Sequence, residues 1–148
     1  MKRHPSLAHL SRDHHPALIL AQLLKRTAPD YKGLPHSTAG KLEYALRFYD
    51  KDLVGHFERE EEMMNILTGI DPELDEKMRQ IKAEHVLIHS LFSSLSTEED
   101  AASALGTLGH TLEAHIRSEE RELFPLIENC CDENKLLAIE KILTSRMS

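Results

Sequence analysis

Histidine is the residue type whose number and spacing point most directly to chemistry in this chain. Ten of the 148 residues are histidine. Three pairs have spacings that suit metal binding, with H-x-x-x-E occurring twice and H-x-x-x-H once: His56 with Glu60, His115 with Glu119, and His85 with His89. Residues four apart lie on one face of a helix, about 6 Å apart along its axis. Neutral imidazole beside carboxylate is a ligand set for iron, manganese or zinc.

Glu60 and Glu119 fall on stripes that are otherwise apolar. The stripe residues recur at intervals of three and four; around Glu60 they include Leu53, His56, Met63 and Leu67, and around Glu119 they include Leu112, His115, Leu123 and Leu126. An ionised carboxylate in an apolar core is costly unless a positive charge meets it. No Lys or Arg occupies the stripes at this level. The sequence therefore predicts that metal cations supply the positive charge.

One further histidine is expected from the N-terminal helical segment, where two neighbours compete. His14 is aligned with Leu10 and Leu18, and its Asp-His context repeats the Glu-His pair that ends at His85. His14 is therefore the predicted ligand, with His15 as the alternative. The full predicted ligand set is His14, His56, Glu60, His85, His89, His115 and Glu119.

Seven ligands fit two metal ions. If both glutamates bridge two octahedral ions, the imidazoles and carboxylates fill nine of twelve positions, and a shared oxo or hydroxo group fills two more. The one open position, on a redox-active pair, would admit a small apolar molecule such as dioxygen or nitric oxide. The pocket for it is predicted to be lined by Leu18, Met63, Ile88 and Phe92. The stripes carry no thiolate, which disfavours copper(I) and iron–sulfur clusters.

The elements that must position these residues are helices. Apolar residues recur every three or four positions in long segments, and the six glycines and six prolines cluster between them. The predicted helices span about 6–27, 38–68, 72–95, the segment from after Thr97 to Pro125, and a short fifth helix at 132–146. Thr97 and Asp100 resemble a capping box, and Pro125 is expected to kink or end the fourth helix. The pattern predicts an all-α, antiparallel up-down four-helix bundle with a short C-terminal fifth helix, in a single domain, 1–148, with its core at about 6–128.

The composition is typical of a soluble globular protein, with 41% hydrophobic and 29% charged residues. Lys and Arg number 18 against 25 Asp and Glu, a net charge of −7, which disfavours nucleic acid and anionic membranes as partners. No apolar run reaches the roughly 20 residues that a membrane span needs. Cys130 and Cys131 are adjacent and cannot join distant segments, so reduced thiols and a cytoplasmic location are expected.

Of four acidic residues near the predicted ligands, three have two interpretations. Asp13 and Glu84 are either surface residues or acceptors of hydrogen bonds from ligand imidazoles. Glu61 and Glu120 are most simply part of a solvated acidic face, and Glu120 is also the alternative to Glu119 if the helix is locally distorted. Their neighbours in space decide between these interpretations.

Four blocks of sequence carry a resemblance to a known family. They are Leu10-Ser-Arg-Asp-His14, His56-Phe-Glu-Arg-Glu60-Glu61, Glu84-His85-Val-Leu-Ile-His89, and His115-Ile-Arg-Ser-Glu119-Glu120 followed by Leu123-Phe124-Pro125. On these blocks the chain resembles the hemerythrin-like family, also called HHE cation-binding domains, over roughly residues 7–128. The last block is the most specific, and its likeness to the His56 block, 59 residues earlier, fits a duplicated helical hairpin.

The resemblance implies an oxo-bridged non-haem di-iron centre, which binds oxygen reversibly in the carriers of the family. In other relatives it implies sensing of oxygen or iron, or handling of peroxide and nitric oxide. The chain departs from the carriers by H-x-x-x-E on the fourth helix, where they have H-x-x-x-x-D, and by having only 13 residues before His14. We therefore expect a protein that binds, senses or stores dioxygen or a similar diatomic at two non-haem irons, with manganese and zinc as the alternative metals. The alternative function is a di-iron enzyme that reduces peroxide or nitric oxide in a stress response.

Overall fold

Helices make up most of the part of the chain that the structure describes. The computed structural model describes residues 2–145, and within this range it contains helices and loops but no strand. The elements in chain order are α1 Pro5–Leu24, α2 Thr38–Phe48, η1 Tyr49–Leu53, α3 Val54–Leu67, α4 Pro72–Ser94, η2 Leu95–Thr97, α5 Ala101–Ser118, η3 Glu119–Leu123, α6 Phe124–Cys130 and α7 Glu133–Ser145. The segments η1 and η3 are π-helical, and η2 is a 3-10 turn. The predicted all-α fold class is confirmed.

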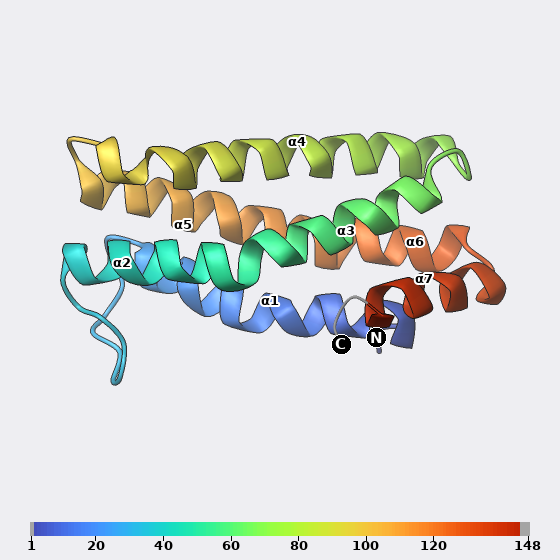
Figure 1. Cartoon of the computed structure of the whole chain (residues 1–148), viewed down its shortest axis with the longest axis horizontal. Helices are drawn as coiled ribbons and strands as arrows, with labels where there is room; N and C mark the ends of the chain where they lie inside the picture. The colour runs from blue at the N-terminus through green and yellow to red at the C-terminus, as the bar shows by residue number, and fades with distance from the viewer. Residues whose placement is uncertain (1, 146–148) are drawn as a thin grey trace.

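Four helical rods run side by side along the long axis of the molecule (Figure 1). α1 and α4 are single helices, while α2–η1–α3 and α5–η3–α6 form two composite rods. Successive rods run in opposite directions, as the colours of Figure 1 show, and α7 packs against α1 and α3. This arrangement is consistent with the predicted up-down bundle and its short fifth helix. No helix within residues 2–145 is both long enough and apolar enough to cross a lipid bilayer.

Two helices with side-chain caps, α2 and α4, start where the sequence predicts, and a third, α5, starts later. Ser37 and Asp71 cap α2 and α4 by accepting hydrogen bonds from backbone amides three residues further on. The fourth rod begins later than predicted, because Asp100 rather than Thr97 is the N-cap of α5. Thr97 instead ends the 3-10 turn η2, so the predicted capping box is wrong. The predicted end of the fifth helix, residue 146, lies outside the described residues.

The fourth rod continues through Pro125, where the sequence predicts a kink or an end. Pro125 is the second residue of α6, which extends to Cys130. Proline is tolerated in the first turn of a helix, where a missing amide hydrogen leaves no intrahelical bond unmade. The π-helical turn η3, directly before α6, provides such a restart within a continuous rod. Glu119 therefore lies well inside the rod rather than close to its end.

Two apolar clusters fill the bundle, with a buried polar layer between them. The first cluster includes Leu10, Met63 and Phe124, and the second includes Phe57 and Ile88. Along each rod, polar residues come between members of the first cluster and members of the second. These buried polar residues are His14, His56, Glu60, His85, His115 and Glu119. Inward-facing donors from facing helices, gathered at one level, are the usual construction of a metal site inside a helical bundle.

Candidate metal centre

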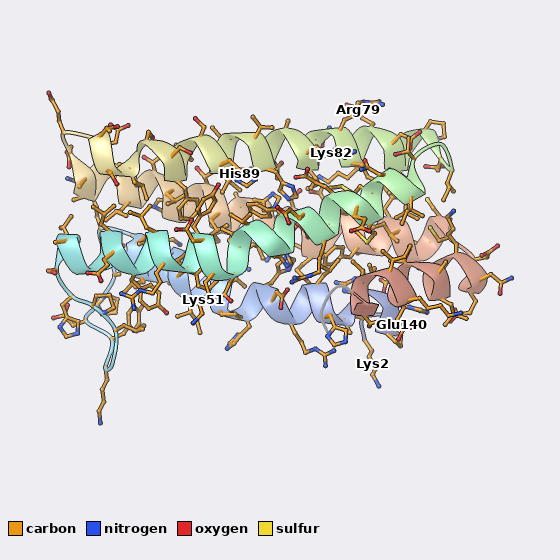
Figure 2. The ribbon with its side chains drawn as sticks, in the orientation of Figure 1. Lys2, Lys51, Arg79, Lys82, His89 and Glu140 are labelled. Atoms are coloured by element: carbon orange, nitrogen blue, oxygen red, sulfur yellow. The ribbon has the colours of Figure 1, made fainter. Side chains whose placement is uncertain are left out.

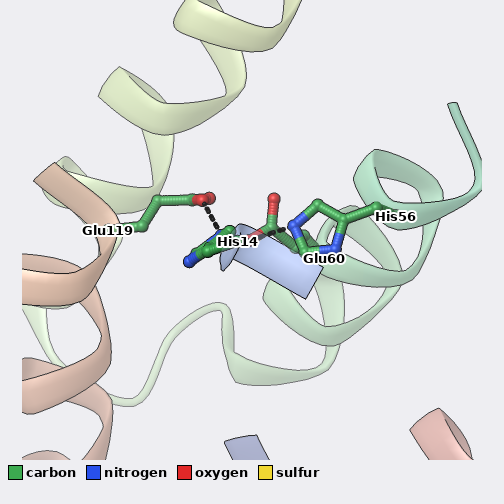
Figure 3. A group of neighbouring side chains, drawn as sticks. All are labelled: His14, His56, Glu60 and Glu119. Carbon is green, nitrogen blue, oxygen red and sulfur yellow. Dashed lines mark ion pairs between the residues drawn. The ribbon is translucent and has the colours of Figure 1, made fainter. Parts of the chain in front are cut away.

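Six of the seven predicted ligands meet in the buried polar layer. They are His14 from α1, His56 and Glu60 from α3, His85 from α4, His115 from α5 and Glu119 at the start of η3. None of them is more than 3% exposed. Figure 3 shows four of these side chains turned toward one another. His15, the alternative to His14, is exposed on the outside of α1, so the structure places His14 in the layer.

The six side chains form two overlapping sets of four candidate ligands. One set is His14, His56, Glu60 and Glu119, and the other is His85, His115, Glu60 and Glu119. In each set, one ligand atom per residue lies within 4.8 Å of the others. Glu60 and Glu119 belong to both sets, so each carboxylate faces the histidines of both halves of the layer.

Distances between histidines and glutamates repeat across the layer. Between rods, His14 Nε2 lies 2.9 Å from Glu119 Oε1, and His85 Nε2 lies 3.1 Å from Glu60 Oε1. Along the α3 and α5–η3 rods, the corresponding histidine Nε2 to glutamate oxygen distances are 3.3 Å from His56 and 3.4 Å from His115. The two halves of the layer therefore have nearly the same geometry, as two copies of one helical hairpin would.

Each of the four imidazoles also donates a hydrogen bond outward to a carboxylate. The Nδ1 pairs are His14 with Glu120 at 2.6 Å, His56 with Asp13 at 3.0 Å, His85 with Glu61 at 2.7 Å, and His115 with Glu84 at 2.7 Å. An ionised carboxylate only accepts, so Nδ1 carries a hydrogen, and in the neutral imidazole the inward Nε2 then holds the free lone pair. This tautomer and ring orientation are those of a metal ligand, and the outer carboxylate raises the basicity of the imidazole.

The outer contacts decide the open interpretations of the acidic residues. Asp13 and Glu84 are hydrogen-bond acceptors for imidazoles of the layer. Glu61 and Glu120, which the sequence assigns most simply to a solvated face, have the same role and were missed. A signal was present, because both directly follow an inward glutamate, as Asp13 and Glu84 directly precede an inward histidine. Although η3 distorts the helix, Glu119 keeps the inward position.

Several inward atoms of the layer have no hydrogen-bond partner of their own. They are His14 Nε2, His56 Nε2, His115 Nε2, Glu60 Oε2 and both carboxylate oxygens of Glu119. Buried polar atoms without partners are rare because they cost stability, and here all of them face the same small space. Imidazole nitrogen and carboxylate oxygen are ligands for iron, manganese and zinc. The residues present therefore fit metal cations.

Proton affinities in the layer indicate the same need for positive charge. Burial lowers the pKa of His14, but the carboxylates of Glu119 and Glu120, 2.9 and 2.6 Å from its ring nitrogens, outweigh burial and raise the pKa to about 10. Burial raises the pKa of Glu60, yet the charge of His56, whose Nε2 lies 3.3 Å from Glu60 Oε2, holds that pKa well below its usual value. Glu60 thus stays ionised and attracts protons or metal cations to the layer.

His89 is the predicted ligand that the structure does not bring into the layer. It lies on α4, one turn beyond His85, and is labelled in Figure 2. Its Nδ1 is hydrogen-bonded to the Tyr49 hydroxyl, and its ring meets Phe57 edge-on. Phe57 stacks on His85 with ring centroids 4.1 Å apart. The phenyl ring of Phe57 therefore contacts both imidazoles, and the His89 ring is held by Tyr49 outside the layer.

The four predicted pocket residues are divided between the two apolar clusters. Met63 belongs to the first cluster, whereas Ile88 and Phe92 belong to the second, and half-buried Leu18 packs against the second. The polar layer lies between these two groups. A pocket of about 220 Å³ opens beside the layer, at the turn η1, and His56 is part of its lining.

The fold and the site define a class of protein: a helical bundle with a buried cluster of histidine and glutamate that suits metal cations. The family model of the hemerythrin HHE cation-binding domain matches residues 6–127. The chain therefore belongs to this family, which confirms the resemblance seen in the sequence. Comparisons with curated proteins and with solved structures gave no match.

Proposed function

We propose that the protein is a non-haem di-iron protein that binds dioxygen or a similar diatomic molecule in the polar layer. The observation that carries this proposal is the sharing of Glu60 and Glu119 by two sets of four candidate ligands. Two cations can then use both carboxylates as bridges, with two imidazoles on each ion. Iron is the proposed metal because imidazole and carboxylate suit it and because the chain belongs to the hemerythrin family.

The number of ligands available leaves coordination positions open for a further ligand. Four imidazoles and two bridging carboxylates fill eight of the twelve positions of two octahedral ions, and a shared oxo or hydroxo group fills two more. With His89 outside the layer, one position then stays open on each ion, rather than one in total. Bound iron would supply the electrons that hold a diatomic molecule.

The protein's own residues would control the surroundings of such a molecule. The four outer carboxylates fix the imidazoles, and the apolar clusters on both sides of the layer keep bulk water away. The pocket at η1, whose lining includes Asp13, His56 and Arg59, supports an approach from solvent to the His14–His56 half of the layer. Its volume of about 220 Å³ suits a small molecule.

The test is to load the protein with ferrous iron without oxygen and then to add oxygen. We expect two irons per chain, new charge-transfer absorption on oxygenation, and a return to the first spectrum when oxygen is removed. His115→Gln is a matched variant, because it removes one ligand of one set and should hold about one iron without the spectral change. Rapid, irreversible oxidation of a two-iron protein would overturn oxygen binding, and a chain that holds no iron would overturn the metal centre as well.

A second candidate function is the reduction of peroxide or nitric oxide at the same centre. The observation that favours it is the absence of a fifth imidazole from the layer among the described residues, which leaves one open position on each of two neighbouring ions. A reactant could then contact both ions. Turnover of peroxide or nitric oxide with an added reductant would support this function, and an iron-loaded protein without turnover would exclude it.

A further inference from the structure

The polar layer has two halves that share their glutamates but have different surroundings. The first half is defined as His14 and His56 with their outer carboxylates Glu120 and Asp13, and the second half as His85 and His115 with their outer carboxylates Glu61 and Glu84. The inner distances of the two halves agree closely, as described above. Any difference between the halves must therefore come from what contacts the outer carboxylates.

Arginine side chains balance the outer carboxylates of the first half. Arg59 Nη2 lies 2.6 Å from Asp13 Oδ2, and Arg3 Nη2 lies 3.2 Å from Glu120 Oε1. Ser11 donates a further hydrogen bond of 2.7 Å to Glu120. Both arginines are mostly covered, with 19% and 21% of their side chains exposed, so water screens these ion pairs only in part. The two outer negative charges of the first half thus each meet a positive charge.

The outer carboxylates of the second half lack such partners. Within residues 2–145, no Lys or Arg forms an ion pair with Glu61 or Glu84, and each contacts an imidazole of the layer. In the helical repeat, the position that matches Arg59 holds Ser118, whose hydroxyl donates to Glu122. Exposure does not account for the difference, because the side chains of Glu61 and Glu84 are 40% and 36% exposed, against 36% for Asp13 and 29% for Glu120.

We propose that the two cation sites fill in a fixed order and that the second half takes the first ion. This inference rests on the proposed two-ion centre. An ion in either half meets the same two glutamates, but only in the second half does it also meet two unbalanced outer carboxylates. A carboxylate that accepts a hydrogen bond from a ligand imidazole raises the basicity of that imidazole. An arginine paired with the carboxylate weakens this effect. The first ion also neutralises part of the charge of Glu60 and Glu119, which lowers the affinity of the first half further.

Zinc is the probe that tests the order without iron chemistry. Each half with the shared glutamates offers four nitrogen and oxygen ligands, the number that zinc takes in a tetrahedral site. The protein, labelled with ¹⁵N in histidine, is titrated with zinc ions while the imidazole nitrogens are followed by NMR, with His14→Gln and His85→Gln used for assignment. We expect the Nε2 signals of the second half to shift with the first equivalent and those of the first half with the second. The reverse order, or four signals that shift together, would overturn the proposal.

The cause of the order is tested by removing the arginine charges. Arg3→Gln and Arg59→Gln should raise the affinity for the second zinc ion by about tenfold and so narrow the gap between the two binding steps. Arg79→Gln is the matched control, since Arg79 is exposed on α4 and paired with Glu76 (Figure 2). An unchanged ratio of the two dissociation constants in Arg59→Gln and Arg3→Gln would contradict the role assigned to the arginines.

The failure of this inference can be told apart from the failure of the proposed function. An iron-loaded protein that does not bind oxygen would overturn the function and leave the zinc order as measured. Two zinc ions that bind with equal affinity would overturn the order and leave the di-iron proposal in place. A chain that binds no zinc at any ratio would overturn both the order and the two-ion centre.

Discussion

The two halves of the polar layer agree in their inner histidine–glutamate distances and differ in the partners of their outer carboxylates. Their inner distances match closely: His14 to Glu119 and His85 to Glu60 are 2.9 and 3.1 Å. Their outer carboxylates have similar exposure but different partners, because among residues 2–145 arginine pairs with the outer carboxylates of the first half and not with those of the second. The spacing of residues along the helices therefore determines where the ligand atoms lie. The contacts of the outer carboxylates determine how strongly each half attracts a cation.

The largest effect is expected at the residues that the two halves share. Because Glu60 and Glu119 belong to both ligand sets, Glu60→Gln or Glu119→Gln should reduce the bound metal from two ions per chain to less than one. Metal analysis after loading and gel filtration measures this. The exposed Glu76→Gln is the control and should retain two ions. A variant at Glu60 that loses only one ion would show that the halves do not share this carboxylate.

A smaller effect is expected when one half is damaged and the other is left complete. His14→Gln and His85→Gln each remove one ligand from one set, so each variant should retain one ion per chain. The ion that remains in His14→Gln should be held about tenfold more tightly than the one that remains in His85→Gln. Competition with a metal chelator measures both dissociation constants. Equal constants, or the opposite ranking, would remove the electrostatic difference between the halves.

Much of this layer could be predicted from spacing alone. Residues three or four positions apart on a helix face the same side. His56 with Glu60 and His115 with Glu119 could therefore be assigned to the inward face without a structure. Helix starts could be assigned where a proline or a side-chain cap stands next to the first turn, as at Asp71. These features depend on residues close together in the chain.

The rest depends on contacts between rods, which spacing does not report. Glu61 and Glu120 look like solvated residues until His85 and His14 are brought against them by neighbouring rods. The π-helical turn η3 lets the rod continue through Pro125, and Glu119 keeps the inward position although η3 distorts the helix. Such turns widen the helix locally and leave no clear mark in the apolar periodicity.

The helix α5 packs closely against α1, and this close approach can be tested by stability. A Cβ atom on Gly109 of α5 would lie 2.7 Å from the Ala21 carbonyl oxygen of α1. Gly109→Ala should therefore lower the free energy of unfolding by about 1–3 kcal/mol, measured by urea denaturation. Gly106→Ala is the matched control, because its Cβ would meet only the Arg26 side chain at 3.7 Å, and alanine should stabilise the helix by up to about 1 kcal/mol. Equal effects of the two variants would mean that α5 does not approach α1 so closely.

The smallest effect is expected at His89, the histidine that shares a helix face with His85 but not its surroundings. In the structure the His89 imidazole is hydrogen-bonded to Tyr49 and packed on Phe57, away from the layer. His89→Gln should therefore retain two metal ions per chain, with unchanged dissociation constants for the metal. The loss of the Tyr49 hydrogen bond should lower the free energy of unfolding by about 1 kcal/mol, and Tyr49→Phe should do the same. Metal analysis and urea denaturation of both variants measure these effects. If His89→Gln lost an ion while Tyr49→Phe did not, His89 would have to leave Tyr49 and enter the layer when metal binds, and the second half would then hold three imidazoles against two in the first.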